Sequence, residues 1–482
     1  MSYFKILIIM SLMAIVPSSS FSFYDYFDRL TLNQEPDITL QTFALKQNHS
    51  KAHFFNFANS DEGSVSWLNS GVRLARNDPM ISTDIGSWHL AQGHFTQAER
   101  YLMQGHLQGI DEATGKLLAL WQENEEHSKI NELDVGVIAN WDLDIAAAKV
   151  NGLMATGEQA KLTLLAAKFR AQTHLLPLYY ELVEFKVISQ AEPLPRFNAD
   201  LDPSKCPLSI TLLANQLGDL RRWQQLAKEY QKSNLNQFLC IADVRYVKPF
   251  TDACELETKT PIRCNEARLA SELTSLAHVP SDYIALMLPK GGANVHMGIL
   301  YLDRADDGKI FTHEVAHLLG FVDEYKLKQT HPVCQSTNSE LSWNIATVST
   351  NTVSEGYVSL QQLEKLPWYT QIAPTISANQ ANQAKQTNLT KIPVNQALTP
   401  EGVGVFVADT CMESKSVTAL KPLQRNTMMN NHDYPLPPLY VHLLGQNLSR
   451  FKMPSYHYNF GVAMYRAKKG KEALSWLNKA RH

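Results

Sequence analysis

The stretch KIFTHEVAHLLGFVDEYKL, Lys309 to Leu327, combines an apolar helical pattern with two histidines four residues apart. At 100° per residue, four apolar side chains fall on one face of such a helix: Phe311, Val315, Leu318 and Leu319. His313 and His317 fall together on the opposite side, about 40° apart around the axis. We therefore expect a helix that packs through one face and presents two imidazoles on the other.

Two histidines in this arrangement can bind a single metal ion. Nitrogen ligands at about 2.0–2.1 Å from Zn²⁺ require side chains that project side by side, as residues four apart on a helix do. Glu314 lies between the metal-binding face and the apolar face. A carboxylate there can take the proton of a metal-bound water as the water attacks a carbonyl carbon. The pattern predicts one catalytic Zn²⁺ ion, with Glu314 as the general base.

The third ligand is expected shortly after the helix. Gly320 can adopt the left-handed backbone that ends a helix and turns the chain back toward the metal ion. Asp323 follows three residues later and is the expected ligand, with Glu324 as its competitor. Three protein ligands leave a fourth position open for water, which is typical of catalytic rather than structural zinc sites.

The motif HEVAHLLGFVD, which ends at Asp323, resembles that of the metzincin zinc peptidases, H-E-x-x-H-x-x-G-x-x followed by a third ligand. Aspartate in the third position is similar to the branch typified by small secreted bacterial peptidases. The sequence DEY at its end resembles the bacterial metallopeptidases that cleave immunoglobulin A. The resemblance extends from FLCIADVRYV to the segment near Tyr440, and it implies an α+β, zincin-like catalytic domain.

The metzincin resemblance also implies a methionine turn beneath the metal ion. The best candidate is Met429 in RNTMMNNHDYP, followed by Met428, with Met412 in TCMES as the alternative. Paired methionines in an ordinary core are the competing interpretation. Tyr434 is a candidate for stabilising the tetrahedral oxyanion, as a tyrosine does in some relatives, although a packed tyrosine is the simpler interpretation.

The residues before the motif predict a mixed sheet. FLCIADVRYV, DYIALMLP and NVHMGILYLD are expected to be strands and NEARLASELTSLA a helix, an order typical of an α+β domain. The resemblance implies that GGANVHMGILYLD forms an edge strand that binds extended substrate by strand addition. His296 on this strand has no spacing that supports a ligand role. Residues 370–400 are expected to be a long surface insertion.

Three segments have the pattern of helical hairpins and resemble tetratricopeptide-type repeats: residues 86–105, 212–230 and 458–481. Ordinary amphipathic helices are the competing interpretation for the region between Asp111 and Ile188. We expect a helical-repeat region at 23–204, the zincin-like peptidase domain at 205–445 and a C-terminal helical hairpin at 446–482. The fold class is thus α+β with flanking all-α regions, whose helices are expected to offer a protein partner a surface.

The first 22 residues have the architecture of a signal peptide: a lysine, an apolar run, Pro17 and small residues up to Ser22. An uncleaved anchor is the alternative. No later segment is expected to span a membrane, so the protein is expected to be exported, either periplasmic or secreted. Six cysteines favour disulfides in that compartment, and we expect Cys254 to pair with Cys264 and Cys334 with Cys411.

Composition limits the remaining function classes. The 482 residues carry a formal net charge of −3 and no dense run of Lys and Arg, which argues against a nucleic-acid partner. The predicted function is hydrolysis of peptide bonds in a protein or peptide by an exported zinc endopeptidase. Two alternatives stay open: a zinc amide hydrolase that acts on cell-wall material, and a repeat-based binding protein with a vestigial zinc site.

Overall fold

The computed structural model describes residues 37–133, 142–189, 206–274, 276, 279, 281–353, 355–383 and 391–480, with the backbone alone for 378–383. The expected signal peptide lies outside these residues. The protein is mixed α+β, with helical regions and a sheet domain. Among the described residues, no helix is both long and apolar enough to cross a membrane.

The chain forms two compact units. One comprises Met1–Leu153 with Gln172–Leu175, and the other comprises Met154–Ala171 with Leu176–His482. These limits differ from the expected boundaries at 204 and 445. The difference arises because helices that precede residue 204 and the C-terminal hairpin belong to the same unit as the sheet.

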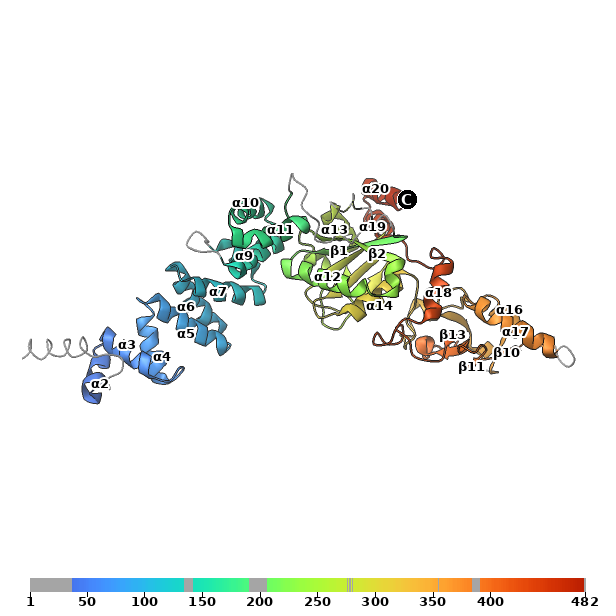
Figure 1. Ribbon diagram of the computed structural model, residues 1–482, viewed down its shortest axis with the longest axis horizontal. Coiled ribbons are helices and arrows are strands. Elements are labelled where there is room, and N and C mark those ends of the chain that lie inside the picture. The colour runs from blue at the N-terminus through green and yellow to red at the C-terminus, as the bar shows by residue number, and fades with distance from the viewer. Residues whose placement is uncertain are drawn as a thin grey trace, which may run out of the picture. The chain divides into compact units, whose positions relative to one another are not determined.

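The first unit is a succession of helices (Figure 1): α2 (Ile38–Lys46), α3 (Ser50–Asn59), α4 (Val65–Leu74), α5 (Pro79–Ala91), α6 (Phe95–Leu107), α7 (Asp111–Glu123), α8 (His127–Glu132) and most of α9 (Leu143–Ala155). The expected hairpin at 86–105 falls on α5 and α6. Gly86 permits their close approach, because a Cβ atom there would lie only 2.9 Å from Cγ of Leu102.

The second unit contains α10 (Gln159–Arg170), α11 (Leu176–Glu184) and a five-stranded sheet in the order β2-β1-β5-β7-β6. Its strands are β1 (Leu208–Ala214), β2 (Leu239–Tyr246), β5 (Tyr283–Leu288), β6 (Asn294–His296) and β7 (Ile299–Asp303). Only β6, at the edge beside β7, runs antiparallel to its neighbour. The helices α12 (Leu217–Tyr230), α13 (Glu266–Glu272) and α14 (Gly308–Leu318) pack on this sheet.

Two expectations about these elements are wrong. The segment 294–303 is not one strand, because Met297 and Gly298 both have positive φ (44° and 87°) and turn the chain between β6 and β7. The segment 212–230 is not a helical hairpin, because its first residues complete β1 before α12 begins. All seven residues of β1 are buried, and such a run has no alternation that separates it from a helix.

A second, antiparallel sheet follows α14, in the order β11-β12-β13-β8. It comprises β8 (Ala346–Ser349), β11 (Gln396–Ala397), β12 (Val403–Ala408) and β13 (Val417–Leu423). Between β8 and β11 in sequence lie the helices α15 (Thr350–Val353), α16 (Leu360–Leu363) and α17 (Tyr369–Gln383), and a separate antiparallel pair of strands, β9 (Tyr357–Ser359) and β10 (Lys391–Pro393). The expected insertion at 370–400 therefore includes most of α17, β10 and β11.

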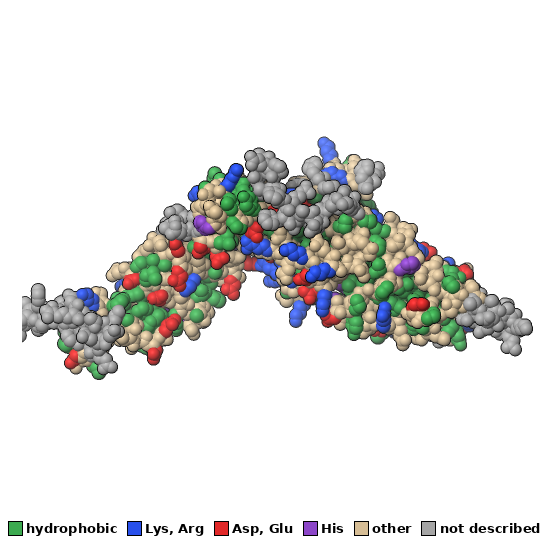
Figure 2. Space-filling model, in the orientation of Figure 1, with side chains coloured by type: hydrophobic (Ala, Val, Ile, Leu, Met, Phe, Trp, Pro, Cys, Tyr) green, Lys and Arg blue, Asp and Glu red, His purple; other side chains and the backbone are tan. Residues whose placement is uncertain are grey.

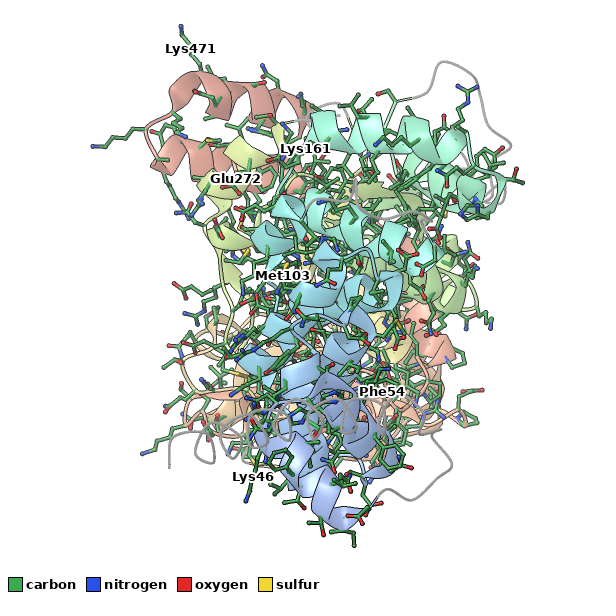
Figure 3. All side chains as sticks on the ribbon, turned by 90° about the vertical axis from the view of Figure 1, so that its left-hand side faces the viewer. Lys46, Phe54, Met103, Lys161, Glu272 and Lys471 are labelled. Carbon is green, nitrogen blue, oxygen red and sulfur yellow. A yellow bond between two sulfur atoms is a disulfide. The ribbon has the colours of Figure 1, made fainter. Side chains whose placement is uncertain are left out.

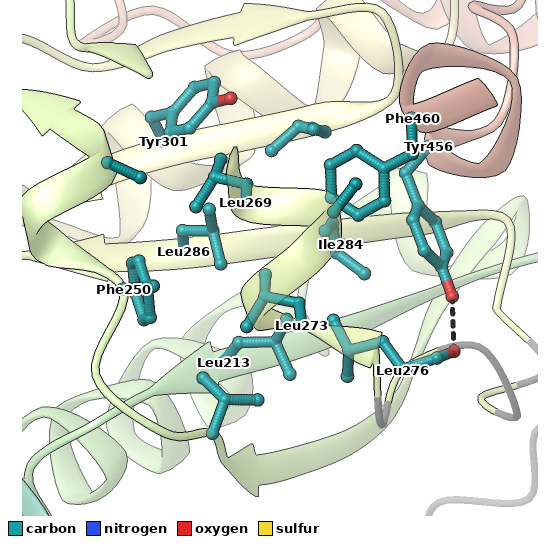
Figure 4. Packing of buried hydrophobic residues seen from close by; sticks show 14 of the residues in the cluster. Leu213, Phe250, Leu269, Leu273, Leu276, Ile284, Leu286, Tyr301, Tyr456 and Phe460 are labelled. Atoms are coloured by element: carbon teal, nitrogen blue, oxygen red, sulfur yellow. Dashed lines mark hydrogen bonds between the residues drawn. The ribbon is translucent and has the colours of Figure 1, made fainter. Parts of the chain in front are cut away.

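The C-terminal hairpin, α19 (Tyr456–Arg466) and α20 (Gly470–Lys479), is part of the sheet domain. Tyr456, Phe460 and Trp476 share a core with α13 and with β5. Figure 4 shows Tyr456 and Phe460 in this core, where the Tyr456 hydroxyl donates to the Leu276 carbonyl at 3.1 Å. Gly461 faces Leu477 as Gly86 faces Leu102, so the two hairpins pack alike. Lys471 projects from the outer side of this hairpin (Figure 3).

Three disulfides are present: Cys206–Cys240, Cys254–Cys264 and Cys334–Cys411. The two expected pairings are confirmed, and the third disulfide joins Cys206, two residues before β1, to Cys240 in β2. Acidic and basic side chains both occur among hydrophobic and other residues on the face shown in Figure 2.

Candidate metal centre

The helix that carries the two histidines is firmly anchored at its start and along one face. Asp307 caps α14, because its carboxylate accepts hydrogen bonds from the backbone N of Lys309 (2.9 Å) and of Ile310 (3.0 Å). On the apolar face, Phe311 meets the rings of Trp223 and Tyr230 edge-on, at 5.5 and 5.3 Å between centroids. The expected apolar stripe thus holds α14 against α12 and leaves the opposite face for the histidines.

His313, His317 and Asp323 converge on one point. The Nε2 atoms of the two histidines lie 3.1 Å apart, and the Asp323 Oδ1 atom lies 3.1 Å from that of His313 and 3.2 Å from that of His317. Gly320, at φ 94°, makes the turn that returns the chain to the helix. Ligands of a tetrahedral Zn²⁺ ion at about 2.0–2.1 Å lie about 3.3 Å from one another, so this donor set fits a metal ion.

The other ring nitrogens fix the orientation of both imidazoles. His313 donates from Nδ1 to the Met428 carbonyl at 2.9 Å, and His317 donates from Nδ1 to the Phe321 carbonyl at 3.0 Å. When both rings are neutral and carry their proton on Nδ1, the lone pair of each Nε2 points toward the common point. Metal-binding histidines in proteins are usually held by such outer hydrogen bonds.

Glu314 is buried beside the two imidazoles. One ligand atom each from His313, Glu314 and His317 lie within 4.8 Å of one another, so this group could hold a metal ion. Burial raises the pKa of the Glu314 carboxyl, and the positive charge available to His317 and His313 partly offsets that effect. The structure therefore places a carboxyl with a raised pKa beside the two imidazoles.

Without a metal ion, His317 and Asp323 shift each other's pKa. Burial lowers the pKa of His317, but the Asp323 carboxylate outweighs it through its charge and its hydrogen bond, and the result is a pKa of about 9. Burial likewise opposes ionisation of Asp323, yet the imidazoles hold the pKa of that carboxyl well below its usual range. A proton on His317 thus supplies the positive charge that a metal ion would otherwise bring.

The competing third ligand, Glu324, faces away from the imidazoles. Its side chain is fully buried and bonded to Tyr440 and Lys421 instead. Asp323 is the carboxylate that the structure brings to both histidines.

Comparison with protein-family models, with curated proteins and with solved structures found no match to this chain.

The segment expected to form the methionine turn lies directly under the site. Met429 is fully buried and its carbonyl accepts from the backbone N of Glu324 at 2.8 Å, while the Met428 carbonyl accepts from His313. Met412, the alternative, is 63% exposed. Met428 therefore contacts His313, and Met429 contacts the residue that follows Asp323.

Tyr434 is not brought to the ligands by any contact that the structure describes. It is 43% exposed, and its neighbour Asp433 pairs with Lys309 at the start of α14. Sequence reasoning missed Tyr325, whose hydroxyl hydrogen-bonds to Asp323 and has a pKa raised by burial and by that carboxylate. Its position two residues after the third ligand was the available signal. His296, on β6, pairs with Glu266 of α13 and takes no part in the site.

Proposed function

We propose that the protein is an exported zinc-dependent endopeptidase with a zincin-like, metzincin-type catalytic domain. The observation that carries the proposal is the convergence of His313, His317 and Asp323, with each imidazole directed by a hydrogen bond to a carbonyl. His313, His317 and Asp323 are proposed to bind one Zn²⁺ ion, since two imidazoles and one carboxylate suit zinc. When bound, the ion supplies a Lewis acid that polarises a carbonyl and makes water a better nucleophile.

Glu314 carries the proton through the reaction. Its carboxylate accepts a proton from the attacking water as the water oxygen bonds to the carbonyl carbon of the scissile amide. The resulting carboxylic acid then gives this proton to the amide nitrogen as the C–N bond breaks. The position of Glu314 supports both steps, because its buried carboxyl lies beside the two imidazoles that would hold the ion.

Two tyrosines are candidates for stabilising the oxyanion that forms in this reaction. Tyr434 is the candidate implied by the metzincin resemblance, and Tyr325 is the one that contacts a proposed ligand. The short edge strand β6 is the proposed site for an extended peptide, because its outer edge is not paired within the described sheet. The oxyanion role of a tyrosine and the peptide-binding role of β6 both rest on the peptidase proposal.

The setting of the enzyme is proposed from its cysteines and its helices. Three disulfides are consistent with an oxidising, extracellular compartment, and the signal-like residues 1–22 suggest export to the periplasm or medium. The helical hairpins, which resemble tetratricopeptide-type repeats, are proposed to present a surface to a protein partner.

The proposal is tested by metal analysis and by digestion assays. Purified protein should contain one zinc ion per chain, and His317→Ala should lose it. The zinc-loaded protein should cleave casein or a peptide library, whereas cleavage of peptidoglycan alone would indicate the cell-wall amide hydrolase instead. A protein that binds zinc but cleaves neither substrate would contradict the peptidase proposal.

A further inference from the structure

Glu324, the residue after Asp323, has its whole side chain in the protein interior at 0% exposure. Three donors surround its carboxylate. Asn344 Nδ2 and the Tyr440 hydroxyl donate to Oε1 at 3.0 and 2.5 Å, and Lys421 Nζ lies 3.1 Å from Oε2. These partners come from three separate segments: the loop before β8, the helix α18 (Pro438–Gln446) and the strand β13.

A buried ion pair is an unusual way to fill this space. Removing a carboxylate and an ammonium group from water costs several kcal/mol per ion, and apolar side chains of similar volume often stabilise a core as well or better. Lys421 is itself only 7% exposed, so both charges bear this cost. A carboxylate with three directed donors does, however, hold the backbone that carries it in one conformation.

That backbone is held on both sides of Asp323. On one side, Asn344 accepts from the backbone N of Val322 through Oδ1 (3.0 Å) and donates from Nδ2 to the Val322 carbonyl (2.7 Å). On the other side, the backbone N of Glu324 donates to the Met429 carbonyl at 2.8 Å. Asn344 therefore joins the two restraints, because its Nδ2 also reaches the Glu324 carboxylate.

We propose that Glu324 is a positioning residue of the metal centre, whose buried carboxylate holds the loop after α14 so that the Asp323 carboxylate meets the two imidazoles. The inference rests on the proposed role of Asp323 as third ligand. None of the three partners of the Glu324 side chain is a proposed ligand. The effect of Glu324 on metal binding must therefore pass through the loop that carries Asp323.

The test measures zinc affinity in the folded protein by competition with a chromophoric chelator. Glu324→Gln keeps the shape of the side chain and removes its charge, and it should weaken zinc binding about 10–100-fold, as outer-shell substitutions do. Tyr440→Phe removes one donor and should weaken binding several-fold. In an Asp323→Ala background, neither substitution should change the affinity further, because the ligand that they position is already absent.

Asp219→Asn is the matched control. Asp219 is a buried carboxylate whose Oδ1 atom pairs with Arg304 Nε at 2.7 Å, outside the loop of the third ligand, so its loss should lower the melting temperature and leave zinc affinity unchanged. The inference would be overturned if zinc affinity were unchanged in both Glu324→Gln and Tyr440→Phe. It would also be overturned if these substitutions weakened zinc binding equally in the wild-type and the Asp323→Ala backgrounds. Should Glu324→Gln not fold, Tyr440→Phe decides. Absence of hydrolysis would contradict the peptidase proposal but not the inference about Glu324, because zinc affinity is measured without a substrate.

Discussion

The Nδ1 atom of His313 donates a hydrogen bond of 2.9 Å to the carbonyl of Met428, a residue 115 positions farther along the chain. Between the two residues in sequence lie the second sheet, the antiparallel pair of β9 and β10, and helix α17. The chain thus returns under α14 only after completing this separate sheet. The orientation of the His313 ring, a proposed metal ligand, therefore depends on the folding of the whole segment between His313 and Met428.

The substitution Glu314→Gln tests the proposed general base. The amide keeps the size of the side chain but cannot accept the proton of the attacking water. We expect kcat/KM to fall about 10²–10⁴-fold, while the zinc content stays at one ion per chain. Peptide-cleavage kinetics and metal analysis of the same preparation measure both quantities. Retained turnover would remove Glu314 from the mechanism, and loss of zinc would instead indicate a role in binding the ion.

The sequence predicted those parts of the site that depend on local geometry. His313 and His317 share a helix face because of their spacing, and Asp323 follows within one turn of chain after Gly320. Met428 and Asn344 could not be predicted in the same way, because their contacts depend on how distant segments pack. In the fold, β1 was misread as part of a helix, because a strand that is buried throughout shows no alternation of apolar and polar residues. The turn between β6 and β7 was missed because a methionine rarely adopts the positive φ that Met297 has here.

Zinc binding should release a proton from the site. In the metal-free protein the Asp323 carboxylate outweighs burial and raises the pKa of His317 to about 9, so this histidine is protonated at neutral pH. An imidazole binds metal through an unprotonated nitrogen, and the apparent affinity should therefore rise about tenfold per pH unit between pH 6 and 8. Titration calorimetry in two buffers of different ionisation enthalpy counts the released protons. Asp323→Asn should reduce that count, and its failure to do so would contradict the assigned cause.

His457 should make the second unit less stable in mild acid. Burial, and then the charge of Lys479, lower the pKa of His457 to about 4 in the folded protein, whereas the unfolded chain has a pKa of about 6.5. As the pH falls from 6.5 to 4, the unfolded state takes up a proton that the folded state does not. This should cost about 2–3 kcal/mol of unfolding free energy and then level off below pH 4.

The measurement is urea unfolding at pH 7 and at pH 4.5. His457→Gln should flatten the difference between the two values, and His442→Gln, at an exposed position of α18, should not. An equal pH dependence in all three proteins would show that other groups govern the acid sensitivity.

The disulfide Cys334–Cys411 should support the metal site, whereas Cys254–Cys264 should not. Cys411 follows Thr410, whose hydroxyl donates to the Asp323 carbonyl at 2.8 Å and whose carbonyl accepts from the backbone N of Leu327 at 2.9 Å. The Cys334→Ser/Cys411→Ser protein should lose about 2–4 kcal/mol of stability and bind zinc several-fold more weakly.

The matched control is Cys254→Ser/Cys264→Ser, which removes the link between β3 (Cys254–Glu255) and β4 (Arg263–Cys264). It should lower the melting temperature with no change in zinc affinity. Equal zinc affinity in the two double variants would mean that the first disulfide has no role in holding the third ligand.

Gly320 should tolerate no side chain, because two separate costs meet at this residue. Its φ of 94° is unfavourable for any residue with a Cβ atom, and that atom would lie 2.4 Å from the backbone carbonyl oxygen of Phe451. Gly402 has a similar φ of 82° but open space around the Cβ position, so Gly402→Ala should cost only about 1 kcal/mol for the backbone. Gly320→Ala should cost about 3 kcal/mol or more in chemical unfolding, since a backbone atom cannot move aside as a flexible side chain can.

Because Gly320 turns the chain toward Asp323, zinc affinity should fall in Gly320→Ala and not in Gly402→Ala. Equal stability of the two alanine variants would show that the chain at Phe451 yields, and that the close approach does not fix the turn.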